Sequence, residues 1–160
     1  TAPISLHWAS GILVLLLGPL QFFPRLRTTA VHRFNGRVYL AASLVTCVAG
    51  STYVFCCGTI GGAQMDVSFL MYAAGMGGCG LMAWLRAVQR DFSSHARWAV
   101  RAFAMGCGSG FYRLLIMPLF VGDAMSGMSH AHQVQWLTIA AWLFWPPMLL
   151  LAEGAIASFP

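Results

Sequence analysis

Charged residues divide this chain into long apolar runs. No Asp, Glu, Lys or Arg occurs in residues 1–24, 38–65, 67–85, 102–112, 114–122 and 124–152. A helix needs about 20 mainly apolar residues to cross the hydrocarbon core of a bilayer. The pattern therefore predicts an all-α bundle of five transmembrane helices at 5–23, 36–56, 67–86, 96–121 and 133–153, the fourth of which contains Arg113.

Residues typical of turns and caps lie at the predicted helix ends. Turn formers are Pro24 after the first helix, Gly58 and Gly61 after the second, and Gly122-Asp123 after the fourth. Ser93 and Ser94 are predicted to cap the fourth helix. Pro146-Pro147 lies inside the fifth helix and is predicted to kink it, because proline cannot donate the backbone hydrogen bond.

The composition agrees with a single membrane domain covering residues 1–160. Hydrophobic residues make up 59% of the chain and charged residues only 8%, with a mean hydropathy of +0.72. Soluble domains carry about 25% charged residues, so a soluble enzyme, a nucleic-acid-binding module and a disordered segment are excluded. The chain has no hydrolase or transferase motif, no paired carboxylates and no pattern for a soluble substrate, and none of its five cysteines forms a C-x-x-C pair.

The positions of the arginines predict how the protein is oriented in the membrane. Eight of the nine lie in two predicted turns: Arg25, Arg27, Arg33, Arg37, Arg86, Arg90, Arg97 and Arg101. Basic loops face the cytoplasm, or the matrix of a mitochondrion. We therefore expect a bacterial cytoplasmic or mitochondrial inner membrane, with the N-terminus on the opposite side. Thr1 in place of Met predicts a processed or partial product.

Two histidines occupy corresponding places in the two arginine-rich turns. His32 opens the second helix and His95 the fourth. Facing imidazoles in a bundle are typical axial ligands of a b-type haem. Arg33, Arg37, Arg97 and Arg101 would then contact the haem propionates, or else a quinone. The alternative is that these residues bind anionic phospholipid or cardiolipin headgroups.

The repeated order of helix, arginine-rich turn, histidine and helix also suggests two hairpins related by a pseudo-twofold axis, plus a fifth helix. Topology alone could place Arg and His in both turns. A second, weaker haem pair on the opposite side would use His7 and His132.

Arg113 is the remaining candidate because it lies inside a predicted membrane helix. A buried arginine costs about 2.5–3.5 kcal/mol on insertion scales, so it should face the bundle and have a partner. The partner would be a cofactor carboxylate, a lipid phosphate or a polar group on another helix, for which Gln21, His7 and Tyr53 are candidates. Snorkelling toward the nearer membrane surface is the alternative.

Several segments together resemble a known family. They are Ser5-Leu-His7-Trp, Leu17 to Arg27, His32-Arg-Phe-Asn-Gly-Arg37-Val-Tyr39, His95-Ala-Arg-Trp-Ala-Val-Arg101, Tyr112-Arg113 with Pro118, and Trp142-x-x-Trp145 with Ala152-Glu153. They resemble the domain-of-unknown-function 2306 family of multi-helix membrane proteins over nearly the whole chain. The resemblance implies a polytopic helical bundle and no established activity. Pro146-Pro147 departs from the family pattern, which has a polar residue there, and His130 and His132 match no family motif.

Two functions remain open from the sequence. One is an accessory subunit of a larger energy-transducing, respiratory-type membrane complex, whose Arg and His turns bind lipids and neighbouring subunits. The other is a cytochrome-b-like haem or quinone electron-transfer protein with His32 and His95 as axial ligands.

Overall fold

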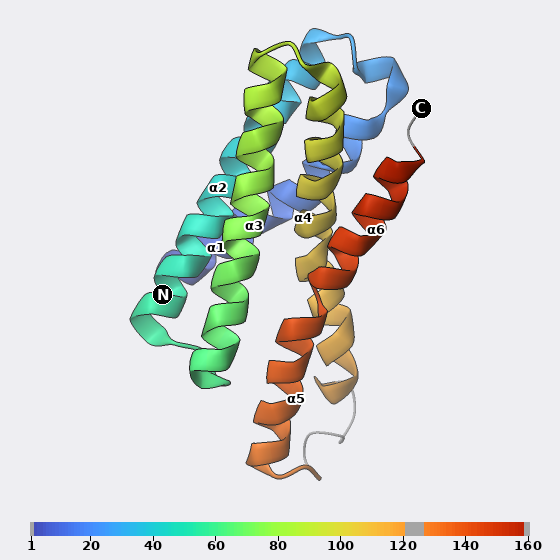
Figure 1. Ribbon diagram of the computed structural model, residues 1–160. Coiled ribbons are helices and arrows are strands. Elements are labelled where there is room, and N and C mark those ends of the chain that lie inside the picture. Colours follow the sequence, from blue (N-terminus) through green and yellow to red (C-terminus); the bar gives the residue numbers. More distant parts are fainter. Residues whose placement is uncertain (1, 121–126, 159–160) are drawn as a thin grey trace.

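The protein is a bundle of long helices. The computed structural model describes residues 2–120 and 127–158 (Figure 1). Its helices are α1 (Ala2–Leu17), the 3-10 turns η1 (Pro19–Phe22) and η2 (Pro24–Leu26), α2 (Ala30–Cys57), α3 (Gly62–Val88), α4 (Phe92–Phe120), α5 (His130–Leu143) and α6 (Pro146–Ala157). The predicted all-helical architecture is confirmed. The turn expected at Gly122-Asp123 lies outside the described residues.

Helices α2 and α4 begin earlier than the apolar runs do, because polar side chains cap them. The hydroxyl of Thr29 accepts the His32 backbone N–H at 3.4 Å, and α2 starts at Ala30. The Asp91 carboxylate accepts the Ser94 backbone N–H at 3.1 Å. The prediction that Ser93 and Ser94 cap α4 was therefore wrong, since Asp91 performs that role. His32 and His95 consequently belong to the helices rather than to the loops before them.

The predicted kink at Pro146-Pro147 is confirmed as a break between α5 and α6. A neighbouring helix supplies hydrogen bonds at this break. The buried Ser68 hydroxyl on α3 donates to the Ala141 carbonyl and accepts from the Trp145 indole N–H at 3.3 Å. Broken helices are tolerated in membranes when such side chains satisfy the exposed backbone groups.

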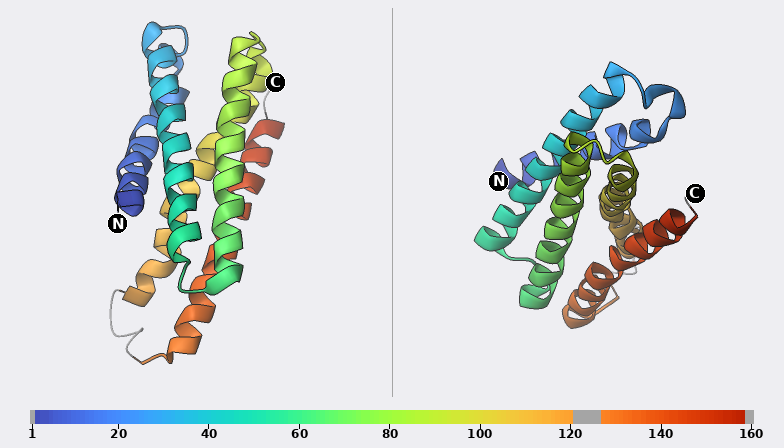
Figure 2. Two further views of the ribbon diagram at one scale, coloured as in Figure 1. Left: turned by 90° about the vertical axis from the view of Figure 1, so that its left-hand side faces the viewer. Right: turned by 45° about the horizontal axis from the view of Figure 1, so that its top comes forward.

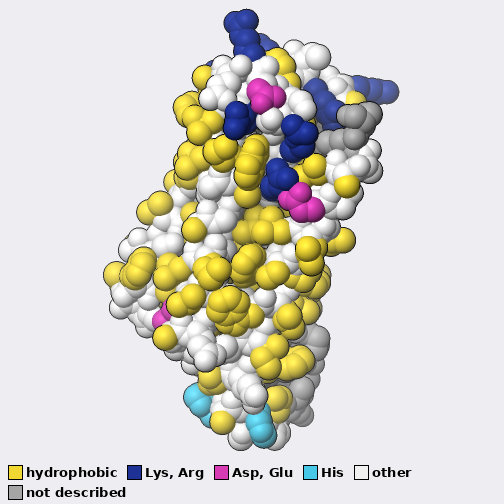
Figure 3. Space-filling view, viewed as in Figure 1, with side chains coloured by type: hydrophobic (Ala, Val, Ile, Leu, Met, Phe, Trp, Pro, Cys, Tyr) yellow, Lys and Arg dark blue, Asp and Glu magenta, His cyan; other side chains and the backbone are white. Residues whose placement is uncertain are grey.

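Both arginine-rich connections lie at one end of the bundle. The α1–α2 and α3–α4 connections are together at the top of Figure 1, and the α2–α3 loop and the start of α5 lie toward the other end, as a second view confirms (Figure 2). Arg side chains gather at that upper end, and apolar side chains cover the middle (Figure 3). We call these the arginine end and the far end.

The core is held by aromatic and small residues. Tyr39 of α2 donates to the Ala102 carbonyl of α4 at 3.2 Å, and Tyr72 of α3 donates to the Met105 carbonyl at 2.7 Å. A side chain at Gly106 would meet the Tyr39 hydroxyl at 3.2 Å, so the small residue admits this contact. Small residues and interhelical hydrogen bonds are typical of helix packing in membranes.

The surface and length of the helices are those of an integral membrane protein. Among the described residues, four stretches are long and apolar enough to cross a bilayer: Ala2–Phe22, Ala30–Cys57, Gly62–Val88 and His130–Ala157. Many large apolar side chains on them are exposed, including Phe55 at 77% and Leu150 at 73%. Such surfaces are stable against lipid, where no water contacts them.

Candidate functional site

The structure brings His32 and His95 together at the arginine end. Their imidazole centroids are 6.5 Å apart, and the ring planes are nearly perpendicular, at 89°. Two imidazoles that share one metal ion need a separation near this value, because each metal–nitrogen bond is about 2.0–2.1 Å and a ring radius is added on either side. The capped first turns of α2 and α4 hold both residues, which are partly buried.

The hydrogen bond of His95 fixes its tautomer. His95 Nδ1 lies 2.8 Å from the Ala83 carbonyl oxygen on α3. A carbonyl only accepts, so Nδ1 carries the hydrogen, and in the neutral ring Nε2 has the free lone pair. Metal-binding histidines are commonly oriented by such a bond from the other ring nitrogen. Nδ1 of His32 is buried and has no hydrogen-bond partner within the described residues.

Two imidazoles suit a haem better than an isolated metal ion. Within the described parts of the chain, no group of three or more His, Cys, Asp or Glu could hold a metal. A structural zinc site needs four protein ligands. A haem iron needs only axial ligands from the protein. His32 and His95 could supply two such ligands.

The predicted arginines surround this pair in different ways. Arg33 and Arg37 are exposed on the first turns of α2, and Arg33 is close enough to His32 to interact with it electrostatically. Arg97 is exposed and donates to the Ser94 hydroxyl at 3.3 Å. Arg101 instead pairs with Glu153 of α6, through hydrogen bonds of 2.6 and 2.8 Å, and its guanidinium lies 4.7 Å from the Trp98 ring centroid. Arg101 therefore already has a carboxylate partner within the chain.

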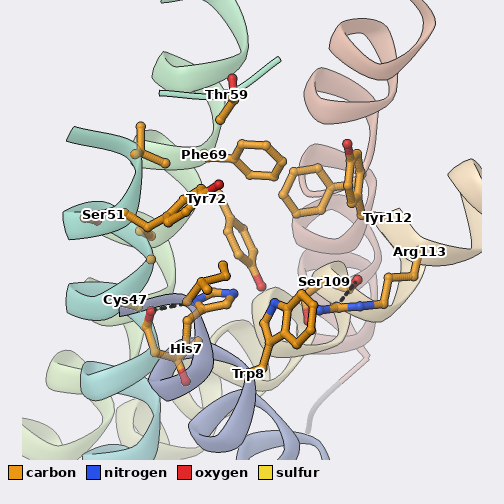
Figure 4. Close-up of a pocket in the computed structure, with 17 residues that line it drawn as sticks. His7, Trp8, Cys47, Ser51, Thr59, Phe69, Tyr72, Ser109, Tyr112 and Arg113 are labelled. Atoms are coloured by element: carbon orange, nitrogen blue, oxygen red, sulfur yellow. Dashed lines mark hydrogen bonds between the residues drawn. The ribbon is translucent and has the colours of Figure 1, made fainter. Parts of the chain in front are cut away.

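A cavity of about 230 Å³ lies in the far half of the bundle. Side chains of α1, α2, α3 and α4 line it together with Phe144 (Figure 4). Aromatic rings form much of the wall, and Phe69, Tyr72 and Tyr112 pack around Phe144 with centroids 4.7–5.8 Å apart.

Two of the predicted site residues, His7 and Arg113, line this cavity. His7 Nδ1 donates to the Thr46 carbonyl at 2.9 Å, and Arg113 Nη1 donates to the Ser109 carbonyl on its own helix at 2.9 Å. Of the partners predicted for Arg113, His7 and Tyr53 line the same cavity. Gln21 does not, and lies beside Gly36 instead.

The structure does not bring His7 and His132 together. His7 lies within α1 against Gly50 of α2. His132 is exposed in the first turn of α5, where its backbone N–H donates to the Ser129 hydroxyl at 3.4 Å. The N-terminal end of α1 and the start of α5 are well separated in Figures 1 and 2.

Sequence reasoning missed two features of these sites. The Ala83 carbonyl carries no sequence signal, because every residue has a backbone carbonyl. The aromatic wall of the cavity combines residues from five parts of the chain, such as Trp8, Phe69 and Tyr112. Their helical positions could be noted in the sequence, but their convergence could not.

Comparison with known proteins identifies a family. The family model described as "Predicted membrane protein (DUF2306)" matches residues 4–156. No curated protein and no solved structure matches the chain.

Proposed function

We propose that this chain, which belongs to the DUF2306 family of predicted membrane proteins, is a cytochrome-b-like electron-transfer protein, and the support for that role is its pair of imidazoles. His32 and His95 would hold the iron of a b-type haem at the arginine end. The haem supplies one-electron redox chemistry when bound. The residues of the chain bind it, orient it and keep it at the edge of the apolar bundle.

One observation carries the proposal: two imidazoles from different helices lie edge to face with centroids 6.5 Å apart, and one of them has its Nδ1–H bonded to a carbonyl. An interfacial histidine that only contacts headgroups needs neither feature. The Nδ1 of His32, buried and without a hydrogen-bond partner in the described part of the chain, is a second sign that this end of the bundle holds a further group. Arg33, Arg37 and Arg97 are the cations that propionates would contact, while Arg101 stabilises α4 against α6.

The proposal includes five membrane crossings. Helix α4 has 29 residues, or about 43 Å at a rise of 1.5 Å per residue, which exceeds the hydrocarbon core of about 30 Å. The arginine end faces the cytoplasm or the mitochondrial matrix. The most extensive helix contacts are α1 with α2 and α3 with α4, which supports two related hairpins that each contribute one histidine.

Absorption spectroscopy tests the haem. Protein produced in haem-sufficient cells and purified in mild detergent should show a Soret band that shifts on reduction by dithionite. His32→Ala and His95→Ala should each lose most of the bound haem. The matched control is His132→Ala, which removes an exposed histidine at the far end and should retain the spectrum. A colourless wild-type protein after haem reconstitution, or equal spectra in all four proteins, would refute the proposal.

The accessory-subunit hypothesis remains the second candidate, and the Arg distribution supports it. Exposed arginines around the α1–α2 connection are suited to phospholipid or cardiolipin headgroups and to acidic surfaces of partner subunits. A haem-free protein that copurifies with larger respiratory subunits from native membranes would favour this function over the first.

A further inference from the structure

The far cavity has an unbalanced charge. Among the described residues, Arg113 is the only permanently charged side chain that lines it, and no Asp or Glu of that part of the chain belongs to the lining. The ion pairs of the described residues involve Arg86 and Arg101, not Arg113. One guanidinium nitrogen of Arg113 is bonded to the Ser109 carbonyl, a neutral acceptor. The side chain is exposed at the edge of the cavity, where a ligand can reach the guanidinium (Figure 4).

We propose that this cavity binds a single-chain amphiphile with an anionic headgroup, either a carboxylate or a phosphate. The headgroup pairs with Arg113, and the hydrocarbon chain lies along the aromatic wall. The planar guanidinium matches both anions through two parallel hydrogen bonds. Inside a bilayer, an arginine that gains such a partner avoids much of the cost of an unpaired charge.

The shape of the cavity limits the ligand. Its volume of about 230 Å³ is smaller than the roughly 300–1,000 Å³ typical of pockets for drug-sized ligands. It suits one headgroup with the first part of one chain, and is too small for a macrocycle or for both chains of a phospholipid. The walls are mainly apolar, and Trp8, Tyr72 and Phe144 provide flat surfaces against which methylene groups pack.

The site is independent of the proposed haem. Thr46, the lining residue of α2 nearest in sequence to His32, lies about 14 residues further along the helix, or about 21 Å at 1.5 Å per residue. A ligand at Arg113 is therefore remote from the imidazole pair. This separation also argues against a quinone exchanging electrons directly with a haem at His32, so charge recognition is the better explanation of the cavity.

Binding of matched probes tests this inference. Wild-type protein in phosphatidylcholine nanodiscs is titrated with radiolabelled oleate, oleyl alcohol and oleoyl lysophosphatidic acid. We expect at least one of the two anions to bind ten-fold or more tightly than the alcohol. The stronger anion identifies the natural headgroup as carboxylate or phosphate. Equal affinity for all three probes, or preferred binding of the alcohol or of a neutral short-chain quinone, would overturn the proposal.

Variants locate the site. Arg113→Gln should remove the preference for the anion, and Arg113→Lys should retain part of it. Arg25→Gln, which removes an exposed cation at the arginine end, should leave it unchanged. If Arg113→Gln does not fold, the Lys variant and the comparison of probes on wild-type protein still decide the question. Loss of the preference in Arg25→Gln but not in the Arg113 variants would place the anion elsewhere and refute the assignment. The Soret band should be unaffected by Arg113→Gln. The haem proposal and the anion-binding proposal can therefore be refuted independently of each other.

Discussion

Ser68 offers a sharp test of how the broken helix is stabilised. Its side chain is fully buried, and Ser68→Ala removes a single hydroxyl with little change in volume. That hydroxyl is the donor to the Ala141 carbonyl and the acceptor for the Trp145 indole N–H. The variant therefore breaks two hydrogen bonds and leaves a buried carbonyl and a partly buried N–H without these partners.

The loss of those two hydrogen bonds sets the expected change in the free energy of unfolding. Interhelical hydrogen bonds in membranes contribute about 0.6 kcal/mol on average and up to about 1.7, and a buried group left without its partner costs about 1–3 kcal/mol. We expect Ser68→Ala to lower the free energy of unfolding by about 1–3 kcal/mol. For a chain of this length, each 1 kcal/mol shifts the melting temperature by about 2–4 °C.

The assay is thermal unfolding of purified protein in one detergent, with Thr52→Ala as the matched control. Thr52 also donates a hydroxyl to a backbone carbonyl, that of Val48 at 2.8 Å, but it is exposed and the bond lies within its own helix. Its loss should change stability by less than about 0.5 kcal/mol. If Ser68→Ala melts no lower than Thr52→Ala, the α3 contact does not stabilise the break and our account of it is wrong.

Two further predictions concern the helix ends and helix packing. Hydrogen bonds from Ser94, aided by the charges of Arg86 and Arg97, hold the pKa of the Asp91 carboxyl below its usual range. The carboxylate thus contributes stability above its unfolded pKa of about 3.9, and this contribution is lost as pH falls through the lower folded pKa. Melting temperatures measured between pH 6 and 3 should show this loss in the wild type and not in Asp91→Asn. The same pH dependence in both proteins would contradict the prediction. At Gly18, an added Cβ would lie 2.8 Å from the Phe103 ring and 3.0 Å from the Val14 carbonyl oxygen. Gly18→Ala should therefore destabilise the protein by about 1–3 kcal/mol, whereas Gly78→Ala, where no atom lies within 4 Å, should be neutral or stabilising in the same melting assay.

Helix caps explain why the helix boundaries were only partly predictable. Charge-free runs locate the segments that face lipid, but α2 and α4 extend past them because Thr29 and Asp91 provide the first hydrogen bonds. Arg33 and Arg37 are helical although they are charged, since both side chains are exposed. Composition indicates which part of a helix lies in the bilayer, whereas the capping side chain determines the residue at which the helix begins.

The partners of the arginines were less predictable still. Arg101 and Glu153 are 52 positions apart, and nothing local connects them. Arg113 was expected to need a partner on another helix, and the structure gives it the Ser109 carbonyl of its own helix and a shared cavity with His7. Those outcomes depend on how far each helix is rotated about its axis.

The sequence by itself determined the class of protein, the positions of the long apolar segments, the grouping of eight arginines around two connections and the family. Each of these is a property of composition or of neighbouring residues, which act through local hydrogen bonding and transfer into lipid. Only the tertiary structure decided that His32 meets His95, that Arg101 takes Glu153 and that His7 and Arg113 border one cavity. The physical reason is that contacts between helices depend on axial rotation and crossing, which are settled by the packing of many side chains at once rather than by any single segment.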